Sequence, residues 1–486
     1  MEKKKVLLLL FALFLFQFFL IAGLWHQRPL PDEGRYLTTG WLISKGKVPF
    51  KDTFSPKPPA IEFVAAGLFT AFGPSLFAAR MFIAFIAVIQ LALIFALAKK
   101  AFGEKPALIA SLFYCLWSLA FSAYWMVIGP FLALISTAAI FFAYLYLYQK
   151  PCSKNAFLLG LFLGLDVLFK QTMLPFALGM LLVVLAISLF GRKRLPSASE
   201  TVSAIIGLAA MPLLFLLYLF ATGSFSFFVE AMLFPFTQLN NFAEVTVDTK
   251  LLIAVAAFVA VPLSLLGMWK NLLGKKVNRL VIYFSVLWFV FSFSNALPFR
   301  SCCIHLLPAL PAASIFAGFM IARGVKKGRG SLGADLLKAF SIALIILSVF
   351  SVAFFYQAFS SPEYSFTDLE NVASYVKQNS ASNDNIMVFP ATPELYFLSQ
   401  RMPSARQFIF FDPCDEQCQQ PVVEELSFNS PKLMVFFSAD SQYAGSDMEK
   451  MLEFREQNYF LLKVLELEQP VYKTYGYAFI FQRSSN

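Results

Sequence analysis

Long apolar stretches, separated by short polar segments, fill residues 1–359 and then stop. A helix needs about 20 consecutive apolar residues to cross the hydrocarbon core of a bilayer. By this criterion the sequence predicts a polytopic α-helical membrane domain of about eleven spans over residues 1–359. The predicted spans lie near residues 6–25, 76–98, 106–122, 128–148, 156–170, 172–190, 201–221, 251–269, 279–297, 305–322 and 338–356.

Basic residues cluster on one side of this alternation. The clusters are Lys3-Lys4-Lys5, Lys99-Lys100, Lys150 with Lys154, Arg192-Lys193-Arg194, Lys275-Lys276 with Arg279, and Lys326-Lys327 with Arg329. Because basic loops stay in the cytoplasm, we expect a multi-pass protein of the cell membrane with a cytoplasmic N-terminus. Loop 26–75 and the C-terminal domain then lie outside. The first apolar run is long and no cleavage-site pattern precedes Asp32, so we interpret it as an uncleaved span.

Composition separates the chain into two parts. It is 58% hydrophobic and only 14% charged, whereas soluble domains are about a quarter charged. Residues 360–486 hold 9 Lys and Arg against 17 Asp and Glu, while the rest of the chain holds 30 against 12. The basic excess therefore belongs to the membrane part, where it orients helices and meets lipid phosphates, and it does not indicate nucleic-acid binding.

Residues 360–486 predict a small extracytoplasmic α/β domain. A helix through about residue 379 and another around residues 446–458 alternate with short apolar runs typical of strands, at 386–389, 433–437 and 477–481. Arg401 and Arg406 are compatible with surface charges. Cys414 and Cys418 form a disulfide or stay unpaired, whereas Cys115 and Cys152 are expected to be free thiols.

Loop 26–75 carries the most informative polar residues. Pro31 and two acids, Asp32 and Glu33, open a predicted short helix that ends at Gly46, which suits both the proline preference and the helix dipole. Asp32 and Tyr36 then share a face. A second, apolar helix from residue 60 to 72 is too short to span and should lie in the outer interface. These residues alone are also compatible with a capped juxtamembrane helix and a snorkelling Lys57.

The loop as a set resembles the first outer loop of the type C, lipid-phosphate-dependent glycosyltransferases, which include protein O-mannosyltransferases and aminoarabinose transferases of lipid A. The matching positions are Asp32-Glu33-Gly34-x-Tyr36, Gly40, Gly46, Pro49, Asp52, Lys57-Pro58-Pro59, Phe72-Gly73 and Ala78-Ala79-Arg80. Further matches are Gly164-Leu165, Lys170-Gln171, Arg300, His305-Leu306-Leu307-Pro308 and Tyr396-x-Leu398-Ser399-x-Arg401-x-Pro403. The resemblance thus runs over nearly the whole chain.

The resemblance implies transfer of a sugar from a polyprenyl-phosphate carrier to a glycan, lipid or protein acceptor on the outer face of the membrane. Asp32 would be the general base, with inversion at the sugar carbon, and Glu33 a weaker candidate or partner. Arg35 and Tyr36 would contact substrate. The leaving lipid phosphate needs fixed cations, and the candidates are Lys57, then Arg300 and His305, then Lys170. No metal or other cofactor is expected.

Some alternatives remain open. Lys170 and Asp166 lie one helical turn apart in an apolar segment, so an intramembrane salt bridge competes with phosphate binding by Lys170. The segment before the fourth span, residues 124–130, lacks the second acid of many family members, which leaves an inactive donor-binding homologue possible. A transporter or lipid flippase is the rival from another class, although transporter sites usually lie at the midplane.

Overall fold

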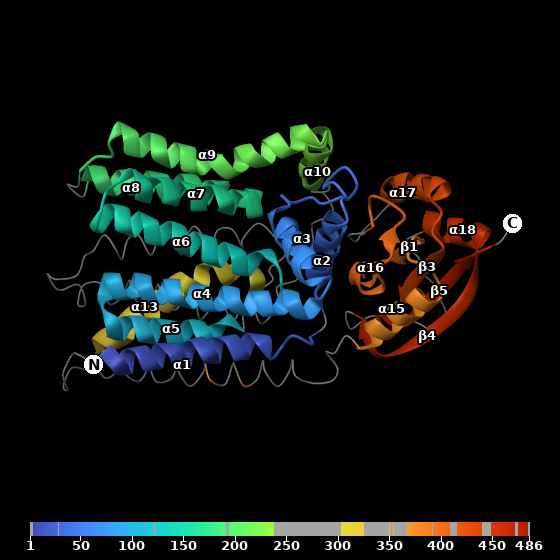
Figure 1. Cartoon of the computed structure of the whole chain (residues 1–486), viewed down its shortest axis with the longest axis horizontal. Helices are drawn as coiled ribbons and strands as arrows, with labels where there is room; N and C mark the ends of the chain where they lie inside the picture. The colour runs from blue at the N-terminus through green and yellow to red at the C-terminus, as the bar shows by residue number, and fades with distance from the viewer. Residues whose placement is uncertain are drawn as a thin grey trace.

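The structure is a computed structural model (Figure 1). It describes residues 3–27, 29–119, 121, 123–190, 194–237, 303–324, 349, 353, 367–390, 392–408, 416–439, 449–471 and 475–484. The predicted spans 251–269 and 279–297, most of 338–356, the boundary at residue 360, Arg300 and Cys414 lie outside the described residues.

The described part of the membrane domain is a stack of long helices (Figure 1). They are α1 (Lys3–Ala22), α4 (Leu76–Phe102), α5 (Glu104–Ser118), α6 (Ile128–Tyr148), α7 (Ser153–Phe169), α8 (Leu174–Phe190), α9 (Ala198–Ala221) and α13 (Leu310–Gly324), the last preceded by the short helix η3 (Cys303–Ala309). Their bounds agree with the predicted spans to within a few residues. The total of about eleven spans stays a prediction, because three of them fall outside the described residues.

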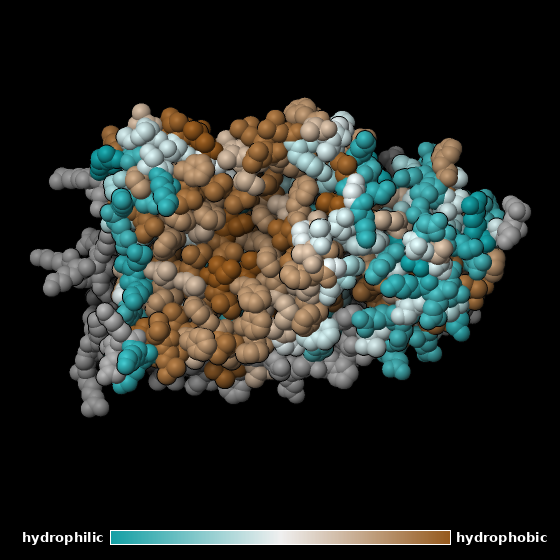
Figure 2. Space-filling view, in the orientation of Figure 1, coloured by the Kyte–Doolittle hydropathy of each residue, from teal (hydrophilic) through white to brown (hydrophobic). Residues whose placement is uncertain are grey.

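An apolar band covers these helices on the face shown in Figure 2. Among the described residues, five helices are long and apolar enough to cross a membrane. On α9, Leu213, Leu217 and Phe220 are 55%, 65% and 63% exposed. Exposure of such apolar side chains is unfavourable in water but not in lipid. The chain is therefore a multi-pass membrane protein. Cys115 and Cys152 are free thiols, as predicted.

Two short helices lie between the membrane helices and the C-terminal domain (Figure 1). They are α2 (Pro31–Ser44) and α3 (Ala60–Phe72), close to the predicted bounds. Gly46 and Gly73 follow them at φ +87° and +76°, a backbone conformation that favours glycine and ends each helix. Gly40 lets α2 approach α3 closely, since a Cβ there would lie 2.4 Å from the Ala65 Cβ.

The C-terminal part folds around a five-stranded sheet of order β2-β1-β3-β5-β4. Strand β1 pairs in parallel with β2 and β3, whereas β5 pairs antiparallel with β3 and β4. The strands are β1 (Asn385–Phe389), β2 (Met402–Pro403), β3 (Leu433–Ser438), β4 (Tyr459–Val471) and β5 (Tyr475–Arg483). The helices are α15 (Thr367–Gln378), α16 (Glu394–Ser399), α17 (Glu416–Phe428) and α18 (Glu449–Asn458). The α/β alternation was predicted, but β2, β4, α16 and α17 were not.

Helix α16 docks the C-terminal part onto α2. The Thr38 hydroxyl donates to the Pro393 carbonyl at 2.7 Å, although the two residues are 355 positions apart. Gly34 lies so close to α16 that a Cβ would come within 2.3 Å of Glu394 Oε2. The glycine in the Asp-Glu-Gly motif is thus where the helix that carries Asp32 contacts the C-terminal part of the chain.

Arg406 ties the same domain to the second half of the loop. Its Nε donates to the Phe50 carbonyl at 2.8 Å, and its own carbonyl accepts from the Phe54 backbone N–H at 3.1 Å. The guanidinium also lies 4.9 Å from the Phe227 ring of α10 (Phe225–Thr237) and 3.4 Å from Glu230. Arg406 is therefore a contact between domains and not merely a surface charge.

Arg401 is also more than a surface charge. It is only 6% exposed, and it donates to the carbonyls of Lys377 and Ser380 at the end of α15. Lys377 lies in the last turn of α15, where carbonyls lack a partner within the helix, and Ser380 follows the helix, so the guanidinium caps its C-terminus. Arg401 therefore stabilises the C-terminal fold itself.

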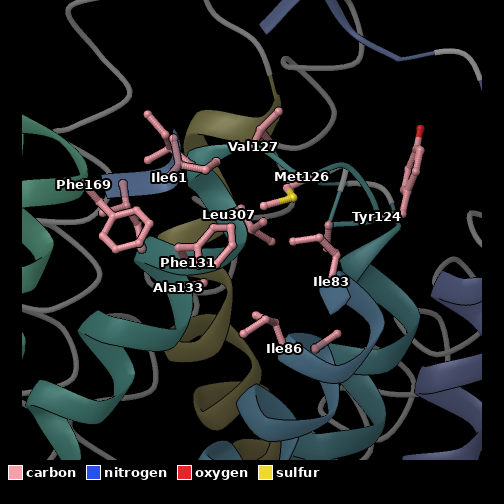
Figure 3. Packing of buried hydrophobic residues seen from close by; sticks show 14 of the residues in the cluster. Ile61, Ile83, Ile86, Tyr124, Met126, Val127, Phe131, Ala133, Phe169 and Leu307 are labelled. Carbon is pink, nitrogen blue, oxygen red and sulfur yellow. The ribbon is translucent and has the colours of Figure 1, made fainter. Parts of the chain in front are cut away.

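A tightly packed apolar layer lies beneath α2 and α3 (Figure 3). Ile61 of α3, Ile83 of α4, Phe131 of α6, Phe169 of α7 and Leu307 of η3 all belong to one buried cluster. The rings of Phe131 and Phe169 stack with centroids 5.1 Å apart. This layer fixes α3, the end of α7 and η3 relative to one another, and these elements adjoin or carry the candidate site residues.

The α2–α3 contact gives a stability prediction. In Gly40→Ala the new Cβ would also lie 2.9 Å from the Glu62 carbonyl, so the helices must separate, at a cost of about 1–3 kcal/mol. Gly67→Ala on α3 is the matched control, since its Cβ meets no atom within 4 Å and alanine favours a helix. Thermal melting of purified protein should show a lower Tm for Gly40→Ala only, and equal melting of both variants would contradict the close approach.

Candidate active site

Asp32 and Lys57 form the centre of the candidate site. Lys57 Nζ donates to Asp32 Oδ2 at 3.2 Å and to the Tyr36 hydroxyl at 3.0 Å. Arg35 Nη2 donates to Asp32 Oδ1 at 3.4 Å, and the guanidinium lies 4.7 Å from the Tyr36 ring. Asp32 and Tyr36 thus share a face of α2, as predicted, and a lysine from the loop before α3 bridges them.

Exposure distinguishes these four side chains. Those of Asp32 and Lys57 are 44% and 28% exposed, whereas those of Arg35 and Tyr36 are 1% exposed. A molecule at the surface of the loop therefore meets the carboxylate and the ammonium group first. Arg35 and Tyr36 support the pair from below.

The cluster keeps both central groups charged. Burial raises the pKa of Asp32, but the charges of Lys57 and Arg35 outweigh it and hold that pKa well below its usual range. Burial lowers the pKa of Lys57, and Asp32 and Tyr36 raise it by more, so the ammonium form is favoured. The site is thus an ion pair at the surface of the membrane domain.

Lys170 and His305 come from other parts of the chain and lie near this pair. Helix α7 ends at Phe169, and Lys170 has an extended backbone with φ −156°. Gln171 Nε2 donates to the Pro56 carbonyl at 3.5 Å, which brings the turn after α7 against the loop of Lys57. His305 in η3 interacts electrostatically with both Asp32 and Lys170. The fold therefore gathers Asp32, Lys57, Lys170 and His305 at one place.

The side chain of Asp166 is hydrogen-bonded to Ser136, whereas the sequence suggested a salt bridge with Lys170. Its Oδ2 accepts from the Ser136 hydroxyl on α6 at 2.9 Å, and its side chain is fully buried. The salt-bridge alternative assumed that Lys170 continues the helix of Asp166. Because α7 stops at Phe169, Lys170 leaves the helical face and turns toward the loop of Lys57.

Glu33 lies in a fully buried ion pair on the opposite side of α2. Its carboxylate accepts from Arg80 Nε at 2.6 Å and Nη2 at 2.5 Å, and from the Met126 backbone N–H at 2.8 Å. Arg80 also donates to the carbonyls of Leu24 and Gln27. The segment 124–130, which carries no second acid, thus contributes a backbone donor that holds Glu33.

The structure adds one acidic residue that the sequence interpretation passed over. Glu62 is fully buried in α3 and accepts from the Ser55 hydroxyl at 3.2 Å. A lone carboxylate in an apolar interfacial helix is a signal that the sequence offers. The sequence offers no comparable signal for the contact that Arg406 makes between domains, because Phe50 and Glu230 are distant from Arg406 in the chain.

Metal ligands do not gather in the described part of the chain. Among those residues, no group of three or more His, Cys, Asp or Glu side chains could hold a metal ion.

The family model of dolichyl-phosphate-mannose-protein mannosyltransferases matches residues 56–216, about a third of the chain. A search of curated proteins found no match. The matched segment includes Lys57, Arg80 and Lys170. It begins after Asp32.

Solved structures share the fold along the whole chain. ArnT from Cupriavidus metallidurans bound to undecaprenyl phosphate is 14% identical with a TM-score of 0.66, over 100% of this chain and 99% of that one. The Archaeoglobus fulgidus oligosaccharyltransferase tethered to an acceptor peptide is 13% identical with a TM-score of 0.59, over 100% and 74%. The mycobacterial arabinofuranosyltransferase AftD is 12% identical with a TM-score of 0.53, over 100% and 42%. The family match and the shared fold confirm the resemblance to the type C, lipid-phosphate-dependent glycosyltransferase superfamily.

The buried pair of Glu33 and Arg80 gives a prediction for the stability of the folded chain. Glu33→Gln leaves the Arg80 guanidinium buried without a counter-charge, which costs about 3–5 kcal/mol. Asp32→Asn removes a half-exposed carboxylate on the neighbouring residue and should cost far less. Thermal melting in detergent should therefore separate the two variants. If Glu33→Gln melts like wild type, the pair does not hold the loop.

Proposed function

We propose that this chain transfers a sugar from a polyprenyl-phosphate carrier to an acceptor at the outer face of the membrane, by a single inverting displacement. The observation that carries the proposal is the exposed Asp32–Lys57 pair, with Lys170 and His305 beside it. One carboxylate and the two lysine cations are what an acceptor hydroxyl and a leaving lipid phosphate require.

Asp32 is the proposed general base. Its half-exposed carboxylate is open to an acceptor hydroxyl, and its low pKa keeps it ionised. In the displacement the acceptor oxygen forms a bond to the sugar carbon as the carbon–oxygen bond to phosphate breaks. The hydroxyl proton passes to Asp32, and the carrier leaves as polyprenyl phosphate.

Lys57 is the proposed first cation for the donor phosphate, with Lys170, His305 and Arg300 as further donors. Lys57 is in hydrogen-bond contact with Asp32 in this structure, so a donor phosphate must compete with the carboxylate for it. Once the ammonium group turns to the phosphate, Asp32 loses part of the charge that holds its pKa low and becomes a stronger base. Donor binding would thereby activate the base.

Glu33, Arg35 and Tyr36 are proposed to orient the site. Glu33 is committed to Arg80, so its carboxylate is not available to an acceptor. Arg35 and Tyr36 are buried under Asp32 and Lys57 and hold the two in register. Direct contact of Arg35 or Tyr36 with a substrate would require α2 to move.

The orientation in the membrane is also a proposal. The N-terminus lies at the end of the helical stack away from the C-terminal domain, and that end is hydrophilic (Figures 1 and 2). Positive loops favour the cytoplasm, so the site and the domain of residues 360–486 would face outward, above a membrane domain of residues 1–359. The lipid-linked donor would reach the site from the bilayer, and the acceptor from outside.

The test is sugar transfer from a panel of polyprenyl-phosphate sugars by protein in nanodiscs. Asp32→Asn is expected to lower kcat by about 10²–10⁴-fold, because the acceptor hydroxyl loses its base. Lys57→Ala is expected to raise KM for the donor and to lower kcat, because the leaving phosphate loses a cation. Released polyprenyl phosphate and labelled product are measured together.

Lys51→Ala is the matched control for Lys57→Ala, since Lys51 is an exposed lysine of the same loop. It should turn over like wild type. If Asp32→Asn also turns over like wild type, the base is another group. If wild type binds a donor without consuming it, the chain is a donor-binding protein, and if no donor binds at all, a transporter becomes the better hypothesis.

A further inference from the structure

Helix α3 is apolar except for Glu62 and Thr70, and Glu62 points into the protein. Its side chain has no exposed surface, and among the described residues its Oε2 has no hydrogen-bond partner. Burial raises the pKa of Glu62 to about 7, although Arg35, Ser55 and Lys57 act to lower it. Near neutral pH this carboxyl therefore exists in both protonation states.

Ser55 connects this carboxyl to the lysine of the site. Its Oγ lies 3.2 Å from Glu62 Oε1 and 3.4 Å from the backbone carbonyl of Lys57. A hydroxyl has one proton to donate, and a carboxylate and a carbonyl both only accept. When Glu62 is ionised, Ser55 can satisfy only one of the two, and the charged oxygen is the stronger acceptor.

Protonation of Glu62 removes this conflict. The carboxyl then donates its proton to Ser55 Oγ, and the Ser55 proton is free to go to the Lys57 carbonyl. All three groups join in one chain of hydrogen bonds from α3 to the backbone of Lys57. The neutral state therefore fixes the segment that carries Lys57, and the ionised state releases it.

The charged groups around Glu62 do not replace this connection. Glu62 interacts electrostatically with Arg35 and Tyr36 of α2 and with Lys57 of the loop. Two other helices that contact α3 carry Arg80 on α4 and Asp166 on α7, and these are bound to Glu33 and Ser136. Ser55 is the side chain within hydrogen-bond distance of both Glu62 and the Lys57 backbone.

We infer that Glu62 is a positioning residue for the donor phosphate: its protonated carboxyl acts through Ser55 to hold Lys57 in the orientation that meets the phosphate. This inference rests on the proposed function of Lys57. It gives the site a second carboxyl, which lies on α3. The segment before α6, residues 124–130, carries no acid. The affinity for the donor is then highest when Glu62 is neutral.

The experiment measures binding of dolichyl-phosphate mannose as the probe, in nanodiscs at pH 6, 7 and 8. Its phosphodiester has no group that titrates in this range. Wild type should bind about three- to tenfold more weakly at pH 8 than at pH 6, the range expected for one lost hydrogen bond. In Glu62→Gln, whose amide always donates, the pH dependence should shrink to the part contributed by Lys170, whose pKa burial lowers to about 8.

Two hydroxyl deletions separate positioning from general damage. Ser55→Ala cuts the connection, so it should bind more weakly than wild type at pH 6, and its remaining pH dependence should match that of Glu62→Gln. Thr70→Ala removes a hydroxyl of α3 that donates only within its own helix, and it should keep the wild-type pH step. A pH step in Glu62→Gln equal to that of wild type would overturn the inference. Absence of any probe binding by wild type would instead overturn the proposed donor site.

Thermal stability gives a readout that needs no ligand. The pKa of Glu62 is about 7 in the folded chain and 4.5 ordinarily, so folding favours the neutral form. The stability that this carboxyl contributes is complete below pH 4.5 and is lost as the pH rises to 7. The Tm of wild type should therefore fall relative to Glu62→Gln between pH 5 and 8, and a constant difference would contradict the titration of Glu62.

Discussion

The buried ion pair of Glu33 and Arg80 is the interaction on which the rest of the site depends. Removing two charges from water is costly unless each is fully paired, and here the carboxylate meets two guanidinium nitrogens and the Met126 N–H. Arg80 also donates hydrogen bonds to the backbone carbonyls of Leu24 and Gln27, before α2. This network ties α2 to α4 and to the segment of Met126, while the side chain of the neighbouring residue, Asp32, is 44% exposed.

The lipid phase imposes the second constraint. Charged groups are tolerated where helices end or lie on the surface, so the loop and the broken end of α7 are where Lys57 and Lys170 can gather. The close packing of Ile61, Phe131 and Phe169 sets the spacing of these ends (Figure 3). The apolar layer thus holds Lys57 and Lys170 near one carboxylate, an arrangement that suits the proposed transfer from a lipid phosphate.

The C-terminal domain holds the loop from the other side. Thr38 binds Pro393 on the α2 side, and Arg406 binds Phe50 in the loop before α3. The two halves of the loop, one with Asp32 and the other with Lys57, are therefore held by the same domain. Between them, Glu62 and Ser55 connect α3 to the lysine, so that the position of Lys57 depends on helix packing as well as on charge.

The sequence by itself determined the membrane class, the bounds of most described helices and the presence of Asp32 and Lys57 in one loop. These features depend on local periodicity and on a motif within 26 residues. It left open whether Lys170 lies beside Asp166 or beside Lys57, it passed over Glu62, and it allowed Arg406 to be a surface charge. Only the tertiary structure decided these points, because each depends on contacts between segments far apart in the chain, which periodicity does not encode.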